Sequence, residues 1–147
     1  MNGRYFLDTN VLVYANDRSS PKKQRVARLL IAHALTSGQG CLSTQILQEF
    51  FVVVTRKAGV NPSNARAQML HLSRLHVVTI DTGLVLEAID LHLIDRISFW
   101  DALVVKSARA AGCKVVFTED LGHGRLHDGV RIQNPFKKLP DFVTGGK

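Results

Sequence analysis

The stretch that decides the fold is Tyr5-Phe6-Leu7-Asp8-Thr9-Asn10, close to the start of the chain. Three apolar residues are followed at once by polar ones, a pattern that predicts a short buried strand ending in a turn. In open α/β sheets, ligands bind beyond the carboxyl ends of the strands. A carboxylate directly after this strand is therefore a candidate functional group.

The same alternation of strand and helix continues along the chain. Further strands are predicted at residues 41–42, 77–80, 114–117 and 130–132. Helices are predicted between them, each opened by a residue type that caps helix N-termini: Ser20, Ser43, Asn61, Asp81 and Ser98. This order predicts an α/β fold, a three-layer sandwich with a short, mostly parallel central sheet flanked by helices.

Length and composition are those of one globular domain. The chain has 147 residues, of which 46% are apolar and 21% charged. We expect one domain over residues 1–136 and an irregular tail over residues 137–147. No apolar run approaches the ~20 residues of a membrane span, and no signal peptide is recognisable at the start. Cys41 and Cys113 lie in apolar runs without a disulfide framework, which favours the cytoplasm.

The positive charge is concentrated in the first half of the chain. Residues 1–74 carry ten basic and three acidic side chains, whereas residues 75–147 carry nine of each, so the first half accounts for the net charge of +7. This asymmetry favours a polyanionic partner, either nucleic acid or an acidic protein segment. A solubilising surface without a partner is the alternative.

Four carboxylates are predicted at one edge of the sheet. Asp8 and Asp120 each follow a predicted strand, while Glu49 and Asp101 lie on helices that begin near the same edge. Glu49 and Asp101 are surrounded by apolar residues, which is unusual for carboxylates that merely face solvent. We therefore expect all four to lie close together.

Each carboxylate also has a structural explanation of its own. Asp8 could cap a helix, Glu49 could reach solvent, Asp101 would be stabilised in a first helical turn by ~0.3–1 kcal/mol, and Asp120 could belong to a turn. Together they are harder to explain, because two carboxylates ~4 Å apart repel by about 4 kcal/mol at an effective dielectric of 20. A divalent cation relieves that repulsion, and oxygen ligands favour Mg²⁺ or Mn²⁺ over Zn²⁺.

The segments around these carboxylates resemble the motifs of PIN-domain nucleases. The four matching segments are Phe6–Ala15, Leu42–Phe50, Ser98–Leu103 and Thr118–Leu121, and the closing stretch Gly129–Phe136 resembles that of the compact bacterial members. The carboxylates are spaced by 41, 52 and 19 residues, which is of the expected order. Within the family, the chain is most similar to VapC-type toxins of bacterial toxin–antitoxin pairs.

The resemblance implies a metal-dependent endoribonuclease that uses Mg²⁺ or Mn²⁺. Asp8 and Asp101 would be the principal metal ligands, and Asp120 and Glu49 would complete the site. It also implies an RNA substrate, a cognate antitoxin as inhibitor, and a homodimer. Three neighbouring residues are candidates for orienting the ligands or a phosphate, although they serve equally well as turn and cap residues: Asn10, Ser43 and Thr118.

Several other residues are candidates for contacts with RNA. A groove that follows the phosphate backbone could be lined by Lys22, Lys23, Arg25, Arg28, Arg56, Lys57 and Arg66, although some of these belong to solvated helix faces. Trp100 could stack on a base or pack into the core. Glu119 neighbours Asp120 and could point the other way.

Two other functions remain as alternatives. An aspartate-nucleophile phosphatase also carries an aspartate after its first strand, but it needs a second aspartate two residues later, where this chain has Asn10. A catalytically silent nucleic-acid-binding domain would have no need for four carboxylates in one place.

Overall fold

A six-stranded sheet in the order β3-β2-β1-β4-β6-β5 forms the centre of the fold, in a computed structural model that describes residues 3–144. Its strands are β1 (Tyr5–Leu7), β2 (Gly40–Ser43), β3 (His76–Val78), β4 (Val115–Phe117), β5 (Leu126–His127) and β6 (Val130–Gln133). Neighbouring strands are parallel except β5 and β6, which pair antiparallel.

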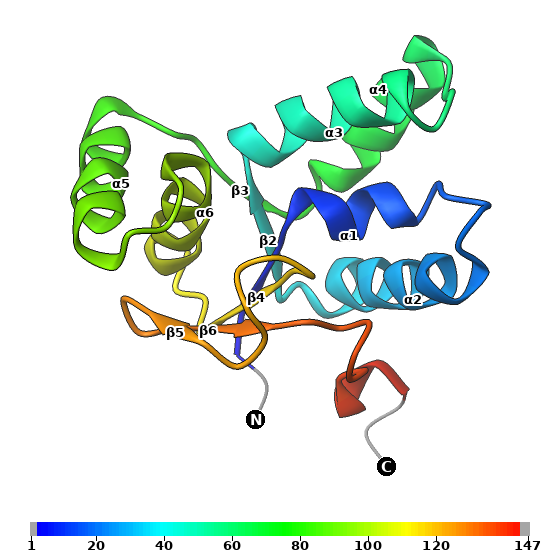
Figure 1. Cartoon of the computed structure of the whole chain (residues 1–147). Helices are drawn as coiled ribbons and strands as arrows, with labels where there is room; N and C mark the ends of the chain where they lie inside the picture. The colour runs from blue at the N-terminus through cyan, green and yellow to red at the C-terminus, as the bar shows by residue number, and fades with distance from the viewer. Residues whose placement is uncertain (1–2, 145–147) are drawn as a thin grey trace.

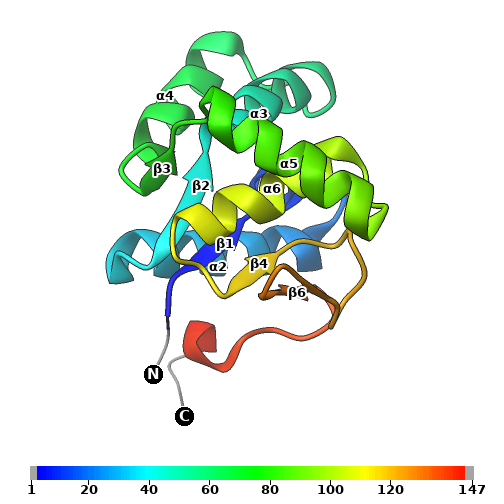
Figure 2. The same ribbon diagram turned by 90° about the vertical axis from the view of Figure 1, so that its left-hand side faces the viewer.

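Helices cover both faces of the sheet. They are α1 (Thr9–Tyr14), α2 (Pro21–Ser37), α3 (Thr44–Arg56), α4 (Pro62–Leu72), α5 (Thr82–Asp95) and α6 (Phe99–Ala110). Figures 1 and 2 show α5 and α6 on one face and α1 and α2 on the other, while α3 and α4 pack together beyond the end of β2. The predicted three-layer α/β sandwich is confirmed.

The order of the strands explains where a ligand would bind. The chain runs outward from β1 to β2 and β3, then returns to form β4 on the other side of β1. Right-handed crossovers in opposite directions place their helices on opposite faces. The strand order therefore reverses between β1 and β4, and a crevice is expected beyond their carboxyl ends. At this junction the backbone N–H of Asp8 donates to the carbonyl of Phe117 over 3.1 Å.

Most helices begin where their capping residues predicted. Side-chain oxygens of Ser43, Asn61, Asp81 and Ser98 accept hydrogen bonds from backbone N–H groups in the first turn of α3, α4, α5 and α6. Ser20 makes no such bond, and α2 instead begins with Pro21, whose fixed φ suits a first helical turn.

The core lies on both sides of the sheet and leaves little spare room. Its largest fully buried side chains include Phe6 of β1, Phe50 of α3 and Phe117 of β4. At the start of β2, a Cβ on Gly40 would overlap the Cβ of Ala34, so only glycine lets this strand approach α2.

Two features of the fold differ from the sequence expectation. The hairpin β5–β6 was not anticipated; its turn is Asp128-Gly129, with positive φ at both residues, as in two-residue hairpin turns. The segment expected to be an irregular tail contains a short 3₁₀ helix, η1 (Asp141–Thr144). It is held against the domain by Phe142, whose ring centroid lies 5.3 Å from that of Tyr5. Within residues 3–144, no helix is both long enough and apolar enough to cross a bilayer.

Candidate active site

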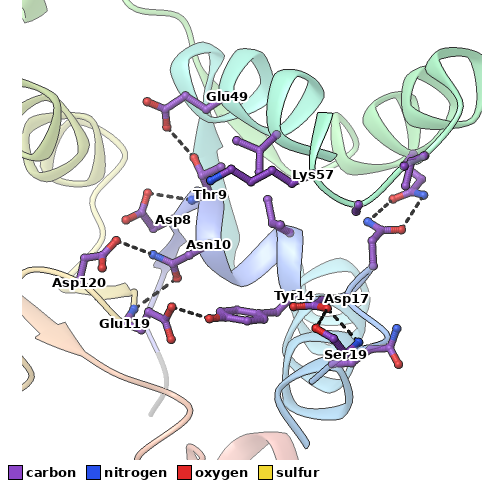
Figure 3. A pocket seen from close by; sticks show the side chains of 18 of the residues that line it. Asp8, Thr9, Asn10, Tyr14, Asp17, Ser19, Glu49, Lys57, Glu119 and Asp120 are labelled. Carbon is purple, nitrogen blue, oxygen red and sulfur yellow. Dashed lines mark hydrogen bonds between the residues drawn. The ribbon is translucent and has the colours of Figure 1, made fainter. Parts of the chain in front are cut away.

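A groove of about 1250 Å³ lies beyond the carboxyl ends of β1 and β4. All four predicted carboxylates line it, although they come from four separate segments of the chain: Asp8, Glu49, Asp101 and Asp120. Figure 3 shows Asp8, Asp120 and Glu49 around the start of α1, which is the wall of the groove nearest the sheet. The structure thus brings together the residues that the sequence placed at one edge.

Asp8 is the most buried of these carboxylates, with 7% of its surface exposed. Its Oδ1 accepts a hydrogen bond of 2.8 Å from the backbone N–H of Thr9, and its Oδ2 accepts one of 2.8 Å from the hydroxyl of Thr118. Burial raises the pKa of Asp8 to about 6, and the charges of Glu49 and Asp101 act in the same direction, while the two hydrogen bonds oppose the rise. The bond from Thr9 also makes Asp8 the cap of α1, which confirms the structural explanation of this residue.

Asn10 connects the start of α1 to the end of β4. Its Nδ2 donates to Oγ1 of Thr118 over 2.9 Å and to Oδ2 of Asp120 over 3.1 Å, and its Oδ1 accepts from the backbone N–H of Glu119. The hydroxyl of Thr118 also accepts from the N–H of Asp120. Of the three predicted supporting residues, Asn10 and Thr118 therefore contact the carboxylates, whereas Ser43 is buried as the cap of α3 and does not line the groove.

Glu49 is held by two residues that the sequence analysis did not single out. The hydroxyl of Thr9 donates to Oε1 of Glu49 over 2.6 Å, and Nε2 of Gln45 donates to Oε2 over 3.2 Å. Gln45 could have been found from its spacing, because residues four apart share one face of a helix. Thr9 carries no comparable signal, because its partner is 40 residues away.

Asp101 stands in the first turn of α6, with its backbone N–H bound to the hydroxyl of Ser98. Burial is the main cause that raises the pKa of Asp101, and the charges of Asp120 and Glu49 raise it further. Asp101 therefore senses the charges of two other carboxylates of the groove.

Glu119 turns away from the other carboxylates. It accepts a hydrogen bond of 2.7 Å from the hydroxyl of Tyr14 (Figure 3). It also forms an ion pair of 2.9 Å with Lys23. Glu119 bonds to Tyr14 and Lys23, whereas Asp120 bonds to Asn10. The loop after β4 is thus held from two sides.

The PIN domain family profile matches residues 5–128. The chain belongs to the PIN domain family. No curated protein matches it in sequence.

Several solved structures are similar in fold to this PIN domain. A toxin–antitoxin complex from Klebsiella pneumoniae is 17% identical, with a TM-score of 0.65 over 89% of this chain and 97% of that one. DNA-bound VapBC from Salmonella typhimurium is 20% identical, with a TM-score of 0.63 over 90% and 98%. The sarcin-ricin-loop-cleaving toxin VapC20 of Mycobacterium tuberculosis is 18% identical, with a TM-score of 0.59 over 79% and 89%. At these identities the likeness is one of fold.

Basic residues of the PIN domain line the same groove as the carboxylates. Of the seven predicted for RNA, Arg28 and Lys57 line it, together with Arg18, which the sequence analysis did not name. Arg25 lines a shallower pocket beside Arg28. Three others lie outside the lining of both: Lys22, Arg56 and Arg66. The charge of Lys23 is paired with Glu119, so this residue is not a free cation in the groove.

The donor set fits a hard divalent cation by its chemistry, because the four predicted carboxylates offer only oxygen. Their spacing is looser than that of a preassembled centre. Among residues 3–144, no group of three or more His, Cys, Asp or Glu converges closely enough to hold a metal ion. The carboxylates would have to draw together to enclose one.

Proposed function

We propose that this PIN domain is a metal-dependent endoribonuclease that acts in the cytoplasm as the toxin of a toxin–antitoxin pair. The observation that carries the proposal is the groove itself, where carboxylates from four separate segments share one cavity with Arg18, Arg28 and Lys57. The fold shared with VapC20 and with two toxin–antitoxin complexes supports it.

Asp8, Asp101, Asp120 and Glu49 are the residues that would hold Mg²⁺ or Mn²⁺. A bound divalent cation would lower the pKa of a water molecule, and its positive charge would stabilise the negative charge on the phosphate that is cleaved. The side chains around the carboxylates set their positions: Thr118 orients Asp8, Asn10 orients Asp120, and Thr9 orients Glu49. Arg18, Arg28 and Lys57 would attract the phosphates that flank the cleaved one.

The direct test is cleavage of a structured RNA by the purified chain. We expect cleavage with Mg²⁺, none with EDTA, and none by the variant Asp8→Asn. The matched control is Asp81→Asn, because Asp81 caps α5 outside the groove and asparagine caps a helix as well as aspartate does. Equal cleavage by Asp8→Asn and Asp81→Asn would contradict the proposal.

The same assay separates the two alternatives. A catalytically silent RNA-binding domain would retain RNA on a filter without cutting it at any concentration of Mg²⁺. A phosphatase would release phosphate from a small phosphoester instead. The phosphatase is disfavoured by Asn10, whose amide group is fully engaged with Thr118, Glu119 and Asp120 and offers no carboxylate.

We also propose a cognate antitoxin and a homodimer as the partners of this chain. The net charge of +7 suits an acidic antitoxin segment as well as it suits RNA. Helix α5 offers an apolar surface for pairing with a second copy, since Leu86, Ile89 and Leu93 are exposed at a spacing that places them on one face. Light scattering on Leu93→Asp should then give half the mass found for the parent chain, and an unchanged mass would exclude this surface.

A further inference from the structure

Trp100 is the only tryptophan of the chain, and its position in the structure is unusual for this residue type. It lies in the first turn of α6, directly before Asp101, and 60% of its surface is exposed. The sequence left open whether Trp100 packs into the core or meets a base, and this exposure excludes the core. The indole lines the same groove as the four carboxylates.

Neighbouring residues hold Trp100 in place. The ring of Phe99 meets the indole edge-on, with 5.0 Å between the ring centroids. The backbone carbonyl of Trp100 accepts a hydrogen bond of 3.3 Å from Nε2 of Gln45, and the same nitrogen donates to Glu49. Because that nitrogen bridges two acceptors, it ties the start of α6 to a carboxylate of α3. Gln45 therefore positions the backbone of Trp100, and Phe99 packs against its indole, beside the carboxylates.

We infer that the Trp100 indole stacks on an unpaired nucleobase next to the phosphate that the carboxylates address. The inference rests on the proposed function and gives Trp100 a role in holding the RNA strand at the groove. Bases within an RNA duplex are stacked on one another, so only an unpaired base can offer its face to a side chain. Stacking of this kind accepts any base, because every base has a π-face.

A protein partner is the competing explanation for an exposed tryptophan. The surroundings of Trp100 favour a nucleotide, because the groove that it lines also contains Arg18, Arg28 and Lys57, which suit a phosphate backbone. The large aliphatic side chains that are exposed on the surface of residues 3–144 lie outside this groove, three of them on one face of α5: Leu86, Ile89 and Leu93.

The test measures binding of short strands to the Asp8→Asn protein in Mg²⁺, so that the probe is not cut. The probes are an end-labelled ribohexanucleotide and the same hexamer without bases. We expect the ribohexanucleotide to quench the indole fluorescence, and Trp100→Ala to weaken its binding about 5- to 150-fold by fluorescence anisotropy. Trp100→Phe should restore most of the affinity. Leu126→Ala is the matched control, because Leu126 is 56% exposed outside the groove, and it should bind as the parent does.

The hexamer without bases should bind the parent and Trp100→Ala alike. Equal affinity of the two proteins for the ribohexanucleotide, or equal quenching by both hexamers, would overturn the stacking inference. So would fluorescence that changes with protein concentration alone, which would assign the indole to a protein interface. If wild-type chain still cuts RNA in those cases, the proposed function stands without the stacking. If the chain neither binds the ribohexanucleotide nor cuts RNA, the proposed function fails and takes this inference with it.

Discussion

The hydroxyl of Thr118 donates a buried hydrogen bond of 2.8 Å to Oδ2 of Asp8, although the two residues are 110 positions apart in the chain. The same hydroxyl accepts hydrogen bonds from Asn10 and from the backbone of Asp120. A hydroxyl has a single proton, and with its lone pairs occupied that proton is directed at Asp8. Thr118 therefore fixes the carboxylate at the junction of β1 and β4.

Two replacements of Thr118 should separate the contribution of its hydroxyl to stability from that of its methyl group. Thr118→Val keeps the shape but removes a hydrogen bond to a charged group, which costs about 1.5–3 kcal/mol. Thr118→Ser keeps the hydroxyl and loses one buried methyl group, which costs about 1 kcal/mol. We expect urea unfolding at pH 7 to show the valine variant as the less stable. A valine variant as stable as the parent would mean that the hydroxyl contributes nothing at this site.

The pKa of Asp8 predicts how stability depends on pH in metal-free buffer. Burial raises this pKa to about 6 in the folded state, whereas an unfolded aspartate has a pKa of about 3.9. The unfolded chain therefore loses its proton first as the pH rises, and the fold loses about 1.4 kcal/mol per pH unit between pH 4 and pH 6 on account of this residue. Above pH 6 the loss is complete.

Asp8→Asn removes that loss and gives the comparison. The free energy of unfolding of this variant minus that of the parent should be larger at pH 7 than at pH 4. The increase should be about 3 kcal/mol, the amount that two pKa units represent. Thermal or urea unfolding in EDTA at the two pH values measures the difference. A difference that does not depend on pH would show that Asp8 titrates as it does in solvent.

Added Mg²⁺ should stabilise the parent chain more than its aspartate variants. A ligand that binds only the folded state adds up to about 2.7 kcal/mol at a hundred times its Kd. We expect the Tm of the parent to rise with Mg²⁺ and that of Asp8→Asn or Asp101→Asn to rise much less. Asp81→Asn should respond as the parent does, since Asp81 lies outside the groove. A full response by Asp8→Asn and Asp101→Asn would move the metal site elsewhere.

The salt dependence of RNA binding should identify the cations that meet the phosphates. For single strands the slope of log K against log salt changes by about 0.7 for each phosphate contact. Arg28→Gln and Lys57→Gln, which change the groove lining, should each flatten the slope by about that amount. Lys23→Gln and Arg66→Gln should change it little, because Lys23 is paired with Glu119 and Arg66 lies outside the groove. The reverse order would place the RNA along the outer face of α2 and α4.

The products of cleavage should carry a 5′-phosphate and a 3′-hydroxyl. Water activated by a metal attacks phosphorus without help from the 2′-hydroxyl, so a 2′-deoxy or 2′-O-methyl group at the cut should not abolish cleavage. End-group analysis of the fragments decides the matter. Fragments that end in a 2′,3′-cyclic phosphate would exclude metal-activated water as the nucleophile.

The sequence was sufficient for those parts of the fold that local chemistry decides. Apolar runs that end in polar residues marked β1 and β4, and capping residues such as Asp81 and Ser98 marked helix starts within a residue or two. The position of Asp8 and Asp120 followed from the rule that parallel strands present their carboxyl ends at one edge.

Contacts between distant segments were beyond the sequence. The sequence around Lys23 gives no sign of its ion pair with Glu119, which lies 96 residues later. The charge of Lys23 is therefore interpreted from the sequence as a contact with RNA. The hairpin β5–β6 is a different case, because Asp128-Gly129 is a turn signal that the sequence analysis left unused.

The place of β1 in the sheet has a consequence for how the chain is made. β1 leaves the ribosome before its neighbour β4 and the hydroxyl that orients Asp8, which follow about 110 residues later in the chain. Pairings over such separations form late, because a long loop must close first. A nascent or prematurely terminated chain that stops before residue 115 carries Asp8 and Glu49 but lacks the strand that completes their groove. Under the proposed function, a chain that has not yet reached β4 lacks a complete active site, and so does a fragment that ends before β4.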